Sequence, residues 1–185
     1  AGSEGPAGAL PPGARVLLVD DCGATLAAAL RLRGARVTRW RRFCRGPRAG
    51  AAWPPGRSGG RLYDGSVMRL PSTKAALELA VQAVAPLLQP GAGLWLYGAV
   101  SEGGLAMRSA LAGPAFYNAR TVALRGEFVV AAAIRGDSPL RERSLAEFAE
   151  QAEIELGGAP LPWRVYPGLF AGGGLDVMTS ALLRV

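Results

Sequence analysis

Short apolar runs that alternate with stretches rich in alanine and leucine constrain the fold of this chain more than any other feature. Residues 15–19 form a compact apolar run that is typical of a buried strand. Residues 24–33 are rich in alanine and leucine and end at Gly34, a common helix stop. Residues 36–40 alternate in polarity and predict a second, exposed strand. The chain is therefore expected to begin with a strand–helix–strand unit.

The same alternation resumes after a stretch rich in proline and glycine at 41–60, which we expect to be a loop or a degenerate segment. Residues 61–70 have strand character and stop at Pro71. Ser72 is then the expected N-cap of a helix over 73–88, in which apolar residues recur at helical spacing. A second strand–helix unit is therefore predicted.

A Pro-Gly pair at 90–91 is expected to end this helix. Three further elements are predicted: a strand at 94–97, a short helix at 105–111 and an amphipathic helix at 144–156. Residues 121–124 and 128–132 flank an Arg-Gly turn and predict an antiparallel hairpin. Alternating strands and helices with a late hairpin predict an α/β fold, with a mostly parallel sheet covered on both faces.

Two stretches of the chain carry a family resemblance. The first is Leu-Pro-Ser-Thr-Lys at 70–74, then the expected helix, then a Pro-Gly turn and strand within 87–98. The second is Tyr-Pro-Gly-Leu-Phe-Ala-Gly-Gly-Gly-Leu-Asp at 166–176, followed by Thr179 and the Leu-Leu pair at 182–183. Together they resemble the small-subunit ribosomal-RNA guanine-N2 methyltransferase family, with Ala171 where serine is usual.

The resemblance implies a Rossmann-like, class I methyltransferase-like sheet with a degenerate cofactor site. It points to the N-terminal half of the family, which has lost cofactor binding and helps to recognise RNA. The resemblance covers most of the chain and is weakest over 41–60. The expected organisation is a flexible lead-in at 1–14, a methyltransferase-like domain at 15–165, and a linker and helix at 166–185. That last segment would lead into a catalytic domain that this chain lacks.

The positions that hold the cofactor in class I methyltransferases are altered here. The turn after the first strand, at 19–25, contains a single glycine, and the second strand runs into Trp40, Arg41 and Arg42 with no acid. Histidine is absent, and two cysteines make neither a zinc site nor a disulfide framework. We therefore expect no cofactor, no metal and no catalytic residue, and we expect that this chain as it stands is not an enzyme.

The charge distribution indicates an anionic partner. The net charge is +7, and no acidic residue occurs between Cys22 and Tyr63. The predicted RNA-binding residues are Arg36, Arg39, Arg41, Arg42, Arg45 and Arg48. Codon bias toward arginine is the alternative explanation. The interleaved aromatic residues Trp40, Phe43 and Trp53 would either stack on unpaired bases or cap the sheet edge.

Two main functions follow from these expectations. The chain is either a non-catalytic component of a ribosome or other ribonucleoprotein that binds ribosomal RNA, or the substrate-recognition half of an active, S-adenosylmethionine-dependent methyltransferase. A protein-interaction module is a third, weaker candidate. An organelle, mitochondrion or chloroplast, is favoured over the cytoplasm. No apolar run reaches the roughly 18 residues of a membrane span, so no membrane partner is expected.

The last segment of the chain carries an apolar stripe. Its members recur at helical spacing and are Leu175, Met178, Leu182 and Val185. The stripe either folds back onto the domain or meets another protein, and we expect it to be an interface with a neighbouring protein.

Overall fold

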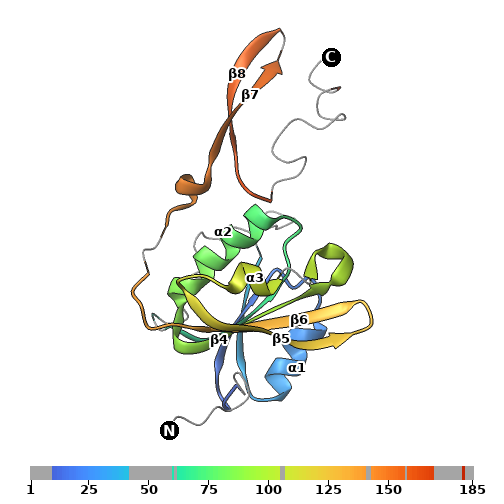
Figure 1. The fold of residues 1–185 in the computed structure, drawn as a ribbon, viewed down its shortest axis with the longest axis vertical. Coiled ribbons are helices and arrows are strands. Elements are labelled where there is room, and N and C mark those ends of the chain that lie inside the picture. The colour runs from blue at the N-terminus through green and yellow to red at the C-terminus, as the bar shows by residue number, and fades with distance from the viewer. Residues whose placement is uncertain are drawn as a thin grey trace.

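The computed structural model describes residues 10–41, 60, 62–104, 107–140, 143–156, 158–168 and 181. Its first half contains β1 (Arg15–Val19), α1 (Thr25–Leu32), β2 (Arg36–Trp40), β3 (Tyr63–Arg69), α2 (Lys74–Val84), η1 (Ala85–Leu87) and β4 (Leu88–Ala99). Its second half contains η2 (Val100–Glu102), α3 (Met107–Leu111), β5 (Phe116–Arg125), β6 (Phe128–Arg135), η4 (Leu145–Phe148), β7 (Glu150–Leu156) and β8 (Ala159–Val165). Figure 1 shows these elements in chain order.

Six strands form one sheet in the order β2-β1-β3-β4-β6-β5. The pairs among β1, β2, β3 and β4 are parallel, whereas β6 runs antiparallel to both β4 and β5. The α/β fold with a mostly parallel sheet and an antiparallel hairpin is therefore confirmed. The chain passes outward from β1 to β2 through α1, and in the opposite direction from β3 to β4 through α2. Right-handed crossovers consequently place α1 and α2 on opposite faces of the sheet.

The larger hydrophobic core lies between the sheet and α2. Alternate residues of the central strands point toward this helix, and Leu17, Met68 and Leu96 are completely buried there. Leu77 and Val84 of α2 pack into the same cluster. Because a strand buried on both faces reads as a continuous apolar run, β1 was recognisable from its sequence alone.

Two predicted boundaries around α2 differ from the structure. The N-cap is Thr73 rather than Ser72, because the hydroxyl of Thr73 accepts a hydrogen bond from the backbone N–H of Ala76 at 3.2 Å. The helix ends at Val84, and Leu88 already begins β4. That strand continues through the Pro-Gly pair at 90–91, where a shift in register against β3 accommodates the irregular backbone.

The amphipathic helix predicted over 144–156 is wrong. Only a short 3-10 turn, η4, forms at its start, and β7 then pairs with β8 as an antiparallel hairpin. Residues 151–155 alternate between polar and apolar, which is the period of a strand, and pairing with β8 selects that conformation. The β7–β8 hairpin forms a separate two-stranded sheet that projects from the six-stranded one (Figure 1). Among the described residues, no helix is long and apolar enough to cross a membrane.

Candidate functional site

The carboxyl ends of β1 and β3 form the point at which the chain direction across the sheet reverses. Open α/β sheets bind ligands at such switch points, because the loops from adjacent strands diverge and leave a crevice. A cavity of about 310 Å³ lies at this edge. Its lining residues are Asp20, Cys22, Arg41, Arg69, Leu70, Pro71, Ser72 and Glu102. This cavity is the candidate functional site.

Arg39 of β2 holds the turn that follows β1. Its Nη2 donates hydrogen bonds to the carbonyl oxygens of Asp21 at 2.7 Å and Gly23 at 2.5 Å. The same nitrogen lies 3.7 Å from a carboxylate oxygen of Asp21, which is itself buried. The parallel pairing of β1 with β2 sets Arg39 opposite Leu18 and so places its side chain beside the turn. The guanidinium thus satisfies two backbone carbonyl oxygens of the turn and lies beside the Asp21 carboxylate.

Tyr97 of β4 binds the same aspartate from the other side. Its hydroxyl donates a hydrogen bond to a carboxylate oxygen of Asp21 at 2.8 Å. Burial raises the pKa of Tyr97 above its usual value of about 10, and the hydrogen bond to Asp21 raises this pKa further. The neutral phenol is therefore the form that the folded protein favours. Asp21 is held between one cation and one neutral donor.

Replacing Tyr97 with phenylalanine should lower the free energy of unfolding by about 1–2 kcal/mol at pH 7, because Asp21 loses a hydrogen-bond donor. The folded-state pKa of Tyr97 is raised, so its contribution is complete below about pH 10 and is lost as pH rises above that value. Urea unfolding of both proteins between pH 7 and 11 checks this. A stability difference that grows with alkaline pH would contradict it.

A second ion pair lies on the opposite wall of the cavity. Nη2 of Arg69 lies 3.0 Å from a carboxylate oxygen of Glu102, and the other carboxylate oxygen accepts a hydrogen bond from the backbone N–H of Ala99. The Ala99 N–H lowers the pKa of Glu102, and Arg69 lowers it as well. Three acids, Asp20, Asp21 and Glu102, lie at this edge, and Asp21 and Glu102 each face a guanidinium group.

The cavity does not fit S-adenosylmethionine as class I methyltransferases hold it. The ribose hydroxyls of that cofactor require an acid at the end of β2, where this chain has the buried Trp40 followed by Arg41. The turn after β1 is fastened by the Arg39 guanidinium. A guanidinium fixed at this turn disfavours a cationic ligand such as S-adenosylmethionine.

The predicted RNA-binding residues that the structure describes differ in their exposure to solvent. Arg36 is exposed on β2, and Arg41 is exposed at the cavity, whereas Arg39 is half-buried against the first turn. Arg42, Arg45 and Arg48 lie outside the described residues, as do Phe43, Trp53 and the stripe of Leu175, Met178, Leu182 and Val185. Their predicted roles in RNA binding and in a protein interface stay predictions.

Trp40 and three residues near the carboxyl edge of the sheet change the interpretation made from the sequence. Trp40 is 5% exposed and packs in the core, so its ring is not available for stacking on a base. Of the two roles predicted for it, capping the sheet edge fits this burial better. Sequence reasoning missed Arg69, Tyr97 and Glu102. Their partners lie 33 or 76 residues away in the chain, and no local pattern marks them.

Solved structures with the same fold are methyltransferases. The chain is similar to the Thermus thermophilus 16S rRNA N2 G1207 methyltransferase RsmC in complex with AdoMet and guanosine, with a TM-score of 0.69 and 23% identity over 95% of this chain. It spans 48%, about half, of that structure. It is also similar to the ribosomal protein L11 methylase from Lactobacillus delbrueckii subsp. bulgaricus, with a TM-score of 0.50 and 15% identity over 69% of this chain and 72% of that one. No family model and no curated protein matches the chain.

The prediction that this chain is not an enzyme is contradicted by the proteins that share its fold. Its structural neighbours are S-adenosylmethionine-dependent methyltransferases, and several hold bound ligands. The prediction rested on two altered positions, the turn after β1 and the end of β2. The backbone nevertheless forms the six-stranded sheet, with a cavity at its carboxyl edge. The chain has the enzyme-like fold of the class I methyltransferases.

Proposed function

We propose that this chain takes part in the methylation of ribosomal RNA as a domain that binds the RNA. The observation that carries the proposal is a set of exposed arginines on α1, on β2 and at the cavity, which we name the α1–β2 arginine surface. Its members are Arg31, Arg33, Arg36 and Arg41. The planar guanidinium group of arginine can donate two parallel hydrogen bonds to one phosphate. A surface of exposed arginines therefore supplies the electrostatic part of RNA affinity.

Arginines outnumber the acids near this surface, which are Asp20, Asp21 and Glu102. Asp21 is buried between Arg39 and Tyr97, and Glu102 is paired with Arg69. The sequence from Cys22 to Tyr63 adds no further carboxylate. The positive potential therefore extends outward from β2, the edge strand of the described sheet, toward solvent.

Ribosomal RNA is supported as the substrate class by a likeness in structure and a likeness in sequence. The Thermus thermophilus structure with the same fold is a 16S rRNA methyltransferase. The Leu-Pro-Ser-Thr-Lys and Tyr-Pro-Gly-Leu-Phe stretches resemble a family that modifies the same RNA. A residence in the ribosome itself and a location in an organelle stay predictions.

Binding of a labelled single-stranded RNA by the intact chain tests the proposal. Each phosphate that an arginine neutralises releases counterions, so the logarithm of the association constant should fall with the logarithm of salt at about −0.7 per contact. Fluorescence anisotropy at several salt concentrations measures this slope. An absence of binding at low salt, or an affinity that salt does not change, would contradict the proposed function.

A further inference from the structure

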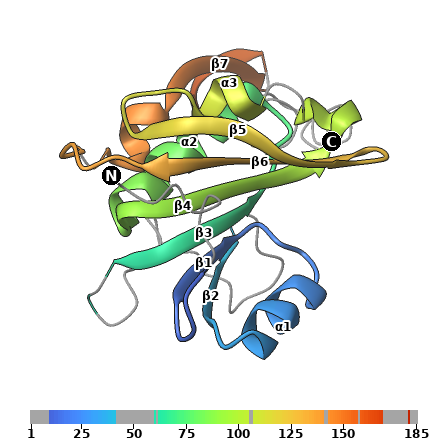
Figure 2. The same cartoon turned by 60° about the horizontal axis from the view of Figure 1, so that its bottom comes forward.

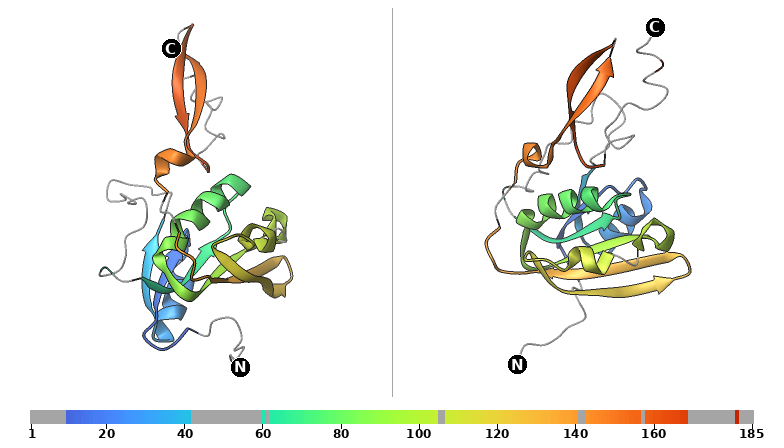
Figure 3. Two further views of the ribbon diagram at one scale, coloured as in Figure 1. Left: turned by 60° about the vertical axis from the view of Figure 1, so that its left-hand side comes forward. Right: turned by 45° about the horizontal axis from the view of Figure 1, so that its top comes forward.

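Within the part of the chain that the structure describes, the sheet face that carries α1 is only partly covered. Helix α1 lies beside β1 and β2, at the opposite end of the sheet from β5 (Figure 2). Along β4, β6 and β5, the helices that the structure describes lie on the other face, where the α2 core is (Figure 3). Half-buried apolar side chains lie on the α1 face: Val67, Trp95, Val130 and Ile134. Their neighbours on the α2 face, such as Leu96 and Val129, are fully buried.

Trp95 lies flat on this open face. A Cβ added to Gly93 would lie 2.5 Å from Cη2 of the indole, and one added to Gly65 would lie 3.0 Å from its Cζ3. Gly65 and Gly93 pair directly across β3 and β4. The indole ring thus packs over the two glycines, and the side chain of Leu10 lies next to Gly65. An indole laid parallel to the sheet presents its other side outward.

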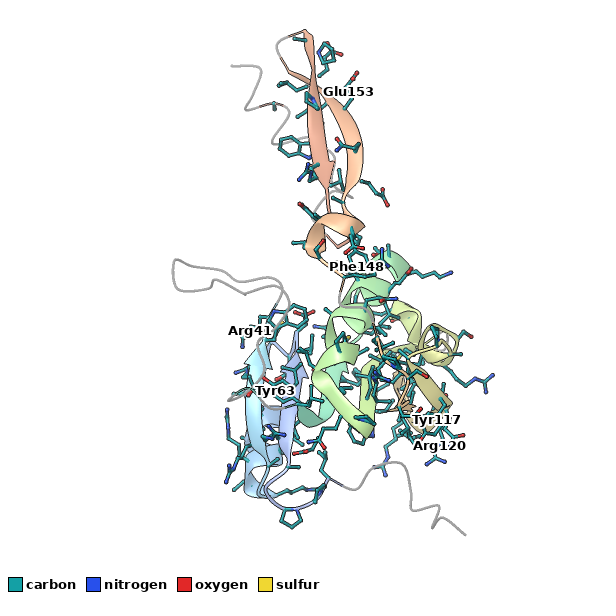
Figure 4. The ribbon with its side chains drawn as sticks, turned by 90° about the vertical axis from the view of Figure 1, so that its left-hand side faces the viewer. Arg41, Tyr63, Tyr117, Arg120, Phe148 and Glu153 are labelled. Carbon is teal, nitrogen blue, oxygen red and sulfur yellow. The ribbon has the colours of Figure 1, made fainter. Side chains whose placement is uncertain are left out.

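A bulge in β5 brings Tyr117 and Arg120 to the same face. Residues three apart in a regular strand point to opposite faces. Here β5 advances three residues while β6 advances two, so that Tyr117 pairs with Ile134 and Arg120 pairs with Ala132. The left-handed backbone of Asn118 lies within this bulge. Figure 4 shows Tyr117 and Arg120 side by side at the edge of the sheet.

We propose that this open face binds single-stranded RNA, with Tyr117 and Trp95 stacking on bases and Arg120 contacting a phosphate. The proposal rests on the RNA binding proposed above and adds a base-stacking surface toward the other end of the same sheet. Two strand spacings, about 10 Å, separate β4 from β5, which suits bases of an extended strand. Aromatic rings on an open sheet are a common platform for unpaired bases.

The charges on β5 favour RNA over a protein partner. Tyr117 is 51% exposed, and β5 carries Arg120 and Arg125 but no acidic residue. An apolar protein surface laid on this face would bury these guanidinium groups without a counter-charge, which is costly. The phosphates of RNA supply that charge, and its bases supply the flat apolar surfaces.

The test compares two substitutions on one strand. Leu124 is also exposed on β5 but pairs with Val129 and faces the other side of the sheet, so Leu124→Ala is the matched control. We expect Tyr117→Ala to weaken binding of a single-stranded RNA of about 12 nucleotides roughly tenfold, as one lost base stack does, and Leu124→Ala to change it less than about twofold. The same RNA with abasic positions should bind wild type more weakly and lose its sensitivity to Tyr117→Ala.

The outcomes separate this inference from the proposed function. If wild type binds RNA with a salt-dependent affinity that Tyr117→Ala and abasic RNA leave unchanged, the stacking face is overturned and the arginine surface stands. If Tyr117→Ala changes the oligomeric state in sedimentation but not the RNA affinity, the face is a protein interface and the inference is wrong. If wild type binds no RNA, the proposed function fails as well.

Discussion

Replacing Arg39 with methionine is expected to lower the free energy of unfolding by about 1.5–3 kcal/mol. The substitution removes the donor to the carbonyl oxygens of Asp21 and Gly23, and it removes the cation beside the buried Asp21 carboxylate. Methionine keeps most of the apolar stem, so the change reports on the guanidinium. The side chain of Arg39 is 28% exposed, and solvent screening keeps the expected loss at this level.

Arg36→Met is the matched control for this measurement. Arg36 lies on the same strand but is exposed, so its replacement should change stability by less than about 0.5 kcal/mol. Urea unfolding of the two variants beside wild type measures both values. If Arg39→Met is as stable as wild type, the guanidinium does not hold the first turn, and the misfit with S-adenosylmethionine loses its structural reason.

The elements built from local patterns were predictable from the sequence. The apolar run of β1, the alanine-rich α1 and the hairpin of β5 with β6 all appear where the sequence placed them. Residues 144–156 were assigned to a helix because their apolar positions suit either period over a short window. Pairing with β8, a tertiary interaction, selects the strand.

Little of the site was predictable from the sequence. The single glycine after β1 and the missing acid after β2 predicted an altered cofactor turn, and in the structure Arg39 donates hydrogen bonds to this turn. The residue that fills the turn was not visible, because Arg39 was grouped with the other arginines as an RNA ligand. Its separate role depends on the register between β1 and β2, which brings it beside Asp21. Tyr97 and Glu102 reach the same edge through partners that lie 76 and 33 residues away in the chain.

The exposed arginines should behave differently from Arg39. Reversing both Arg36 and Arg41 to glutamate is expected to weaken RNA binding and to reduce the salt slope by about 0.7 for each phosphate contact that is lost. The double variant Lys74→Glu and Arg108→Glu changes the net charge by the same amount, at exposed positions on α2 and α3. It should bind nearly as wild type does, because Lys74 and Arg108 lie outside the α1–β2 arginine surface.

This comparison of two double charge reversals, made by anisotropy with one single-stranded RNA across a salt series, tests most directly whether the methyltransferase fold binds RNA through its α1–β2 arginine surface. The account predicts a weaker affinity and a flatter salt slope for Arg36→Glu with Arg41→Glu alone. Equal losses in both double variants would mean that only net charge matters, and an unchanged affinity in both would place the RNA elsewhere. Either result would contradict the account.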